Sequence, residues 1–132
     1  MIILDEQLQN PDIITAIQSW YSGTVIHVRQ LRPNSVIKDD NIATLLHAAQ
    51  RPVFVTINVD DFWCKLPAHA NFCIIAIDLV QESAREVPRI LRQVFSRPEL
   101  KTRTLRLGKV IRVRKERLSY YSFDGQIYDF DS

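Results

Sequence analysis

Acidic side chains directly follow several short apolar runs of this chain, and their type and spacing could support metal-ion chemistry. Three such runs are followed by acids or an amide: Asp5 and Glu6, then Asn58, Asp60 and Asp61, and finally Asp78. In an open α/β sheet, ligands bind outside the carboxyl ends of the parallel strands. Two charges about 4 Å apart repel by about 4 kcal/mol at an effective dielectric near 20, so clustered acids need a cation, a basic partner or protonation. Hard oxygen ligands suit Mg²⁺ or Mn²⁺, which can activate water for phosphodiester hydrolysis.

The same acids have a purely structural interpretation as helix N-caps. Asp39 or Asp40 precedes an apolar helical pattern over 42–49, and both could also reach the proposed edge. Asp60 or Asp61 could cap a helix after the third strand. The pattern alone therefore leaves a metal site and a capping role open.

The elements that must position these acids alternate between strand and helix. Apolar runs predict four strands, at 1–4, 24–28, 52–57 and 72–77. Asn10 and Pro11 predict the start of the first helix, as N-cap and first helical residue. Alternation of this kind predicts an α/β domain over residues 1–96, with helices on both sides of a mostly parallel sheet. A fourth helix is expected from about residue 82 to 95, with Pro88 causing a kink or a late start.

Residues 97–132 differ in character and predict a basic extension packed on the same domain. The segment 109–114 alternates apolar and basic side chains, and 126–130 alternates again after a turn at Asp124-Gly125. We expect a small antiparallel β-element of two or three strands.

The overall net charge of +2 conceals a division along the chain. Residues 97–117 contain nine Lys or Arg and two Glu, a net charge of +7, whereas residues 1–80 carry −3. Basic residues interleaved with aromatic ones are typical of nucleic-acid surfaces. The candidate phosphate-binding residues are Arg103, Arg106, Lys109, Arg112, Arg114 and Lys115. Alternatively, the basic residues protect an edge strand from aggregation, or they meet the acidic edge of a second protomer in a homodimer.

The ordered set of acidic motifs resembles PIN-domain ribonucleases. The segment 54–62, Phe-Val-Thr-Ile-Asn-Val-Asp-Asp-Phe, resembles the family signature Thr-x-Asn/Asp-x-x-Asp-Phe. The opening Leu-Asp-Glu at 4–6 and Asp-Asp-Asn-Ile at 39–42 agree with the same family in order and position. The whole chain is most similar to short, stand-alone bacterial PIN-like proteins, and the resemblance covers residues 1–80 well.

This resemblance implies a three-layer α/β/α fold and a Mg²⁺- or Mn²⁺-dependent endoribonuclease, often the toxin of a toxin–antitoxin pair. RNA, including structured RNA, would then be the substrate and an antitoxin protein the partner. The implied metal-binding and catalytic residues are Asp5, Asp39 and Asp61, with Asp40 as a rival to Asp39 and with Asn58 in a position where many members have Asp. The implied supporting residues are Glu6, Thr56 and Asp60, of which Thr56 orients its neighbours by hydrogen bonding. Asn58 removes one charge from the site, which weakens it.

Two other functions remain open at this point. An inactive PIN-like module would bind nucleic acid or protein without turnover. A phospho-receiver domain also gathers acids beyond a parallel sheet, but it requires an acceptor Asp at the strand end where Asn58 stands. The three histidines, among them His27, lack metal-ligand spacing and are expected to be packing or surface residues. Two cysteines and no apolar leader or membrane span predict a cytoplasmic protein.

Overall fold

The computed structural model describes residues 1–31 and 39–131, and its side-chain description covers 1–31 and 42–131. Strands are found at β1 (Ile2–Leu4), β2 (Val25–His27), β3 (Val53–Thr56), β4 (Cys73–Ile77), β5 (Val110–Arg114), β6 (Arg117–Tyr121) and β7 (Ile127–Asp131). The α-helices are α1 (Pro11–Gln18), α2 (Asp39–Ala48), α3 (Val59–Phe62), α4 (Val87–Ser96) and α5 (Arg103–Arg106). Three 3₁₀ turns accompany them: η1 (Glu6–Leu8), η2 (Val28–Gln30) and η3 (Gln81–Glu86). The described part of the chain contains no helix with the length and apolarity needed to span a bilayer.

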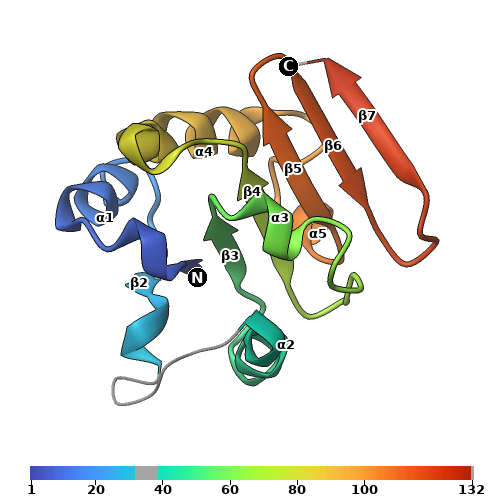
Figure 1. Cartoon of the computed structure of the whole chain (residues 1–132), viewed down its shortest axis with the longest axis horizontal. Coiled ribbons are helices and arrows are strands. Elements are labelled where there is room, and N and C mark those ends of the chain that lie inside the picture. Colours follow the sequence, from blue (N-terminus) through green and yellow to red (C-terminus); the bar gives the residue numbers. More distant parts are fainter. Residues whose placement is uncertain (32–38, 132) are drawn as a thin grey trace.

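All seven strands form one mixed sheet in the order β2-β1-β3-β4-β5-β6-β7 (Figure 1). Strands β1 to β5 are parallel, and β6 and β7 continue the sheet in antiparallel pairing. The α/β class and the mostly parallel sheet predicted from the sequence are therefore confirmed.

The expected small antiparallel element is found as β5, β6 and β7, but it continues the parallel sheet, because β5 also pairs in parallel with β4. Helices α4 and α5 return the chain to the amino end of β4, so β5 runs alongside β4 in the same direction. The predicted hairpin does follow: β6 and β7 are joined through Gly125, whose φ of +71° suits glycine.

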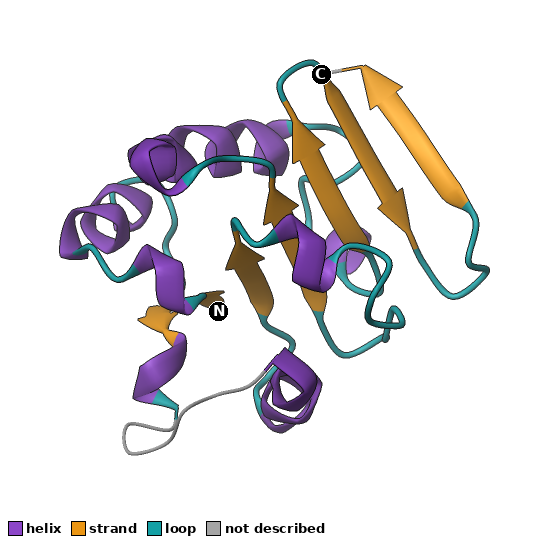
Figure 2. Ribbon diagram, viewed as in Figure 1, coloured by secondary structure: helices purple, strands orange, loops and turns teal. Residues whose placement is uncertain are grey.

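The core lies on both sides of the sheet. On one face, Ile13 and Ile17 of α1 and Leu91 of α4 pack against strand residues such as Ile2 and Val55. We call this the α1/α4 face. On the other face, Ile42, Leu45 and Leu46 of α2 and Phe62 of α3 pack against alternate strand residues such as Ile3, Phe54, Ile74, Val110 and Tyr121. We call this the α2/α3 face, and Figure 2 shows helices on both sides of the strands.

Local sequence signals explain where the helices begin. Asn10 caps α1 by accepting from the Asp12 N–H at 2.9 Å, with Pro11 in the first turn as predicted. Pro88 lies at the start of α4, so the expected fourth helix begins late, after the 3₁₀ turn η3. Proline is tolerated there because the first turn needs no backbone donor.

Candidate functional site

Asp5 is held at the carboxyl end of β1 by the neighbouring strand β3. Its backbone N–H donates to the Val55 carbonyl at 2.9 Å, so the ladder continues one residue past β1. The residue is only 5% exposed. One carboxylate oxygen accepts from the Glu6 N–H at 2.7 Å, and the other accepts from the Thr56 hydroxyl at 2.6 Å. Both oxygens are thus oriented by fixed donors.

Thr56 extends this contact to the start of α3. The hydroxyl that donates to Asp5 also accepts from the Asn58 N–H at 2.9 Å. The Asn58 side-chain amide then donates to Asp61 Oδ2 at 2.6 Å. The result is a chain of hydrogen bonds, Asp5–Thr56–Asn58–Asp61, which we call the Asp5–Asp61 chain.

The capping interpretation of the acids after β3 is not what the structure shows. Asn58 is the N-cap residue of α3, and its side chain forms no capping hydrogen bond. Asp60 and Asp61 lie in the first turn of that helix. The Asn58 amide is instead used to hold the Asp61 carboxylate.

This position in the sheet is a topological switch point. Strand β2 lies on one side of β1, and β3 lies on the other side. The connection after β1 and the connection after β2 therefore lead in opposite directions across the sheet. Open α/β sheets bind ligands at such points, outside the carboxyl ends of the strands. Asp5 and Thr56 come from the two strands that flank it.

Burial raises the pKa of the Asp5 carboxyl, although the hydrogen bonds from Thr56 and Glu6 oppose that rise. The charge of Glu6 raises this pKa further, while His27 lowers it. Burial disfavours the charged form of this carboxyl, and a nearby cation would favour it.

The oxygen donors fit a hard divalent cation. Asp5 and Asp61 supply carboxylates, and Asn58 donates through its nitrogen, which leaves its oxygen as a further ligand atom. The described side chains include no group of three or more His, Cys, Asp or Glu placed to hold a metal. Mg²⁺ usually uses only one or two carboxylates and keeps several waters, so it requires fewer protein ligands than such a group would supply.

The remaining predicted acids lie in several places. Asp39 and Asp40 begin α2, which returns the chain from the carboxyl end of β2 to the amino end of β3; their side chains are outside the described residues. Glu6 lies 3.9 Å from the Arg29 guanidinium, and Asp60 is exposed. Asp78 forms an ion pair with Arg112 at 3.1 Å.

The structure divides the six predicted phosphate-binding residues between opposite edges of the sheet. Arg112, Arg114 and Lys115 lie in or directly after β5, toward the carboxyl edge. Arg103 and Arg106 in α5, together with Lys109, precede β5 and therefore lie toward the amino edge. A count of charges along the sequence cannot separate the two groups, because it takes no account of the direction of β5, which lies between them.

Arg106 is a core residue rather than a surface cation. It is 8% exposed, its guanidinium carbon lies 3.9 Å from the centre of the Phe95 ring, and it donates to the Leu100 carbonyl at 3.0 Å. Burial lowers its pKa. In this structure it is not placed to contact a nucleic acid.

His27 is buried beside the strand that carries Asp5, in agreement with the expectation that it is a packing residue. It ends β2 opposite Leu4, it is 8% exposed, and its Nδ1 accepts from the Arg29 N–H at 3.2 Å. Its Nε2 atom is buried with no hydrogen-bond partner among the described residues.

Comparison with known proteins supplies no relative from which a role could be transferred. No family model matches the chain, and no curated protein or solved structure matches it. The chemistry of the site must therefore be inferred from its own residues.

Proposed function

We propose that this protein is a Mg²⁺- or Mn²⁺-dependent endoribonuclease with a three-layer PIN-like fold. The Asp5–Asp61 chain is the observation that supports this most directly. It gathers two carboxylates and an amide at the carboxyl ends of β1 and β3, from the two motifs that resemble the PIN signature.

In this proposal Asp5 and Asp61 hold the cation, with Asn58 as a weaker third ligand and with Asp39 or Asp40 completing the site. The ion, when bound, supplies charge stabilisation at the phosphodiester and lowers the pKa of water. Thr56 keeps the Asp5 carboxylate in one orientation, and Asn58 does the same for Asp61. Such supporting hydrogen bonds commonly alter metal affinity or activity by 10–100-fold.

The direct test is cleavage of single-stranded RNA by the purified full chain with Mn²⁺. Activity should disappear with EDTA and in the Asp5→Asn and Asp61→Asn variants. Asp12→Asn is a matched control, because Asp12 is an exposed acid in the first turn of α1. Cleavage that survives both EDTA and Asp5→Asn would show that the activity does not come from this site.

A toxin role is part of the same proposal. Expression of the wild-type chain should arrest growth, and Asp5→Asn should relieve the arrest. A small open reading frame that overlaps the gene upstream is the expected source of an antitoxin. A basic segment that meets the acidic edge of a second copy would give a homodimer, which sedimentation at several salt concentrations can detect.

The second candidate is an inactive PIN-like module that binds nucleic acid or protein. It is favoured by Asn58, which is neutral and donates its amide to the Asp61 carboxylate. This function predicts salt-sensitive RNA binding with no turnover under any divalent cation. Mn²⁺-dependent cleavage that is lost in Asp5→Asn excludes it.

A further inference from the structure

One row of residues crosses five strands next to the Asp5–Asp61 chain. The strand register pairs these residues in succession: Thr56, Ala76, Arg112, Ser119 and Asp129. Strands lie about 4.8 Å apart, so the Cα atoms of Thr56 and Arg112 are separated by roughly 10 Å. Arg112 is thus only two strands from the predicted metal site.

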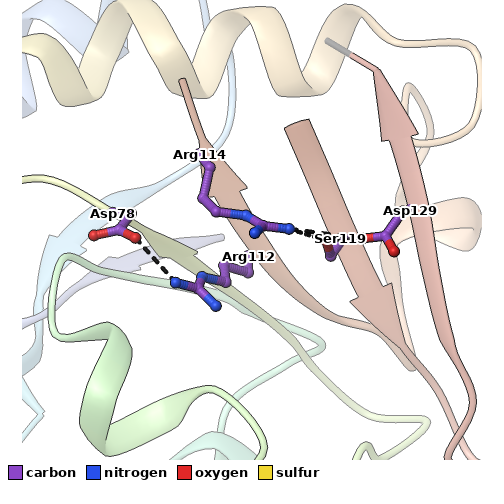
Figure 3. A network of polar contacts seen from close by, with 5 residues as sticks. All are labelled: Asp78, Arg112, Arg114, Ser119 and Asp129. Carbon is purple, nitrogen blue, oxygen red and sulfur yellow. Dashed lines mark hydrogen bonds and ion pairs between the residues drawn. The ribbon is translucent and has the colours of Figure 1, made fainter. Parts of the chain in front are cut away.

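The two arginines of β5 point to the same face of the sheet as Thr56. Successive side chains of a strand alternate between faces. Phe54 and Val110 belong to the core of the α2/α3 face, so Thr56 and Arg112, each two residues further on, share that face. Arg114 follows in the same alternation. Figure 3 shows Arg112 and Arg114 side by side on one side of the sheet.

Each arginine is held by an exposed carboxylate (Figure 3). Arg112 Nη2 lies 3.1 Å from Asp78 Oδ2. Arg114 donates to the Ser119 hydroxyl at 2.9 Å and lies 3.7 Å from Asp129, to which Ser119 also donates. The carboxylates of Asp78 and Asp129 are about half exposed, at 49% and 52%. Exposed ion pairs contribute little to stability, so a phosphate can replace either carboxylate.

Each of the two guanidiniums also has one unpaired N–H donor. The Nε atoms of Arg112 and Arg114 are buried and have no hydrogen-bond partner among the described residues. A guanidinium binds phosphate in a bidentate manner through two parallel N–H donors, and rotation about the side chain can present Nε together with Nη.

Three aromatic residues of β6 and β7, namely Tyr120, Tyr128 and Phe130, face away from these arginines. Tyr120 stacks with Tyr128 and Phe130 and packs against the α1/α4 face. Tyr121 shares the arginine face, but it is buried and contacts Trp63. Trp63 therefore packs against the core here. A ligand on the arginine face would meet phosphate-binding groups without an exposed stacking platform from β6.

We propose that Arg112 and Arg114 bind the phosphate backbone of a single RNA strand where it extends away from the site formed by the Asp5–Asp61 chain. Asp78 and Asp129 hold the two guanidiniums when RNA is absent. This inference rests on the proposed nuclease function and names the path of its substrate. It assigns no such role to Arg103, Arg106 or Lys109, which lie toward the other edge of the sheet. The strand is bound through its backbone and not through its bases.

The first test measures the salt dependence of binding to a fluorescent oligouridine, with EDTA present so that no cleavage occurs. Each phosphate contact on a single strand contributes about 0.7 to the slope of log K against log salt concentration. Arg112→Gln and Arg114→Gln should each lower the slope by about 0.7, and the double variant by about 1.4. Arg103→Gln is the matched control, since it removes the same charge from an exposed residue toward the amino edge. Equal changes in all three single variants would overturn the proposal.

The second test looks for a gain of binding. Asp129→Asn releases Arg114 and should tighten oligouridine binding by roughly 2- to 5-fold, the range given by removing one exposed ion pair. Asp131→Asn removes the same charge two residues further along β7 and should have less effect, because Asp131 is opposite Arg117 rather than Ser119. An equal gain in both variants would mean that only net charge matters, contrary to the proposal.

Two controls separate failure of folding and failure of the nuclease function from failure of this inference. Arg114→Lys keeps the charge, and it should bind more tightly than Arg114→Gln while melting at the same temperature. If wild-type protein binds as described but cleaves nothing with Mn²⁺, the nuclease function fails and the binding path stands. If wild type cleaves, and Arg112→Gln and Arg114→Gln cleave at the wild-type rate at subsaturating RNA, the path fails alone.

Discussion

The Thr56 hydroxyl donates a hydrogen bond of 2.6 Å to the Asp5 carboxylate, although the two residues are 51 positions apart in the chain. Thr56 is fully buried and Asp5 nearly so. Because the same hydroxyl accepts from the Asn58 N–H, its proton is directed at Asp5. The Thr56 hydroxyl therefore links β3 both to Asp5, directly after β1, and to the start of α3.

Replacement of Thr56 by valine tests the importance of that contact. Thr56→Val preserves the shape of the side chain but leaves a buried carboxylate and a backbone N–H without their partner, which should cost about 1–3 kcal/mol of unfolding free energy. RNA cleavage should fall by on the order of 10-fold or more, since Asp5 loses its orienting donor. Urea denaturation and initial cleavage rates measure the two effects. Thr15→Val is the control: Thr15 is an exposed residue of α1, and its replacement should change stability by no more than about 0.5 kcal/mol.

The raised pKa of Asp5 predicts a specific pH dependence of stability. Because burial raises this pKa in the folded state, the folded protein holds the Asp5 proton more tightly than the unfolded chain does. Stability from this group is therefore greatest at low pH and declines as the pH rises from near the ordinary value of 3.8 through the folded-state pKa. The difference in unfolding free energy between wild type and Asp5→Asn, measured by urea denaturation across roughly pH 3.5–7, should show this decline. A difference that is flat with pH would contradict the prediction.

A divalent cation should stabilise the folded protein through the same carboxylate. A ligand present at 100 times its dissociation constant adds about 2.7 kcal/mol to the unfolding free energy. Mn²⁺ or Mg²⁺ should thus raise the melting temperature of wild type in a concentration-dependent manner, as measured by calorimetry. The shift should vanish in Asp5→Ala and persist in Asp12→Ala. An identical shift in both variants would place the bound ion elsewhere.

Arg106 should prove to be a stabilising residue and not a ligand-binding one. Arg106→Gln removes the contact with Phe95 and the hydrogen bond to Leu100, and it should cost about 2 kcal/mol of stability. Its RNA affinity, measured below the melting temperature, should match that of Arg103→Gln. A loss of RNA affinity as large as that of Arg112→Gln would show that Arg106 does bind phosphate, contrary to this prediction.

Short-range signals in the sequence predicted much of this fold. Asn10 and Pro11 predicted the start of α1, and Asp124-Gly125 predicted the turn between β6 and β7, because each depends on backbone preferences of one or two residues. Apolar runs identified β1 to β4 of the parallel sheet. The acids after β1 and β3 could be placed at one edge because parallel strands share their carboxyl ends.

The sequence patterns did not predict how segments that are far apart in the chain pack together. The pairing of β5 with β4 depends on the path of α4 and α5, so the sequence predicted β5 only as part of a small antiparallel element. For the same reason a single run of charge did not reveal that Arg103 and Arg112 lie toward opposite edges. Burial of Arg106 depends on Phe95, which no local pattern connects to it. The sequence predicted that Asn58 and Asp61 lie close together, but it did not predict the hydrogen bond between them.

The interior position of β5 in the sheet also has a consequence for how the chain acquires its structure. Strand β5 lies between β4 and β6, and residues 1–96 alone would leave the buried residues Ile75 and Ile77 of β4 on an open edge. During synthesis, the parallel part of the sheet cannot be completed until residues 110–114 have left the ribosome, because β4 cannot pair with β5 before β5 has been made. A chain truncated at residue 96 should therefore be captured by chaperones or aggregate rather than fold as an autonomous nuclease domain.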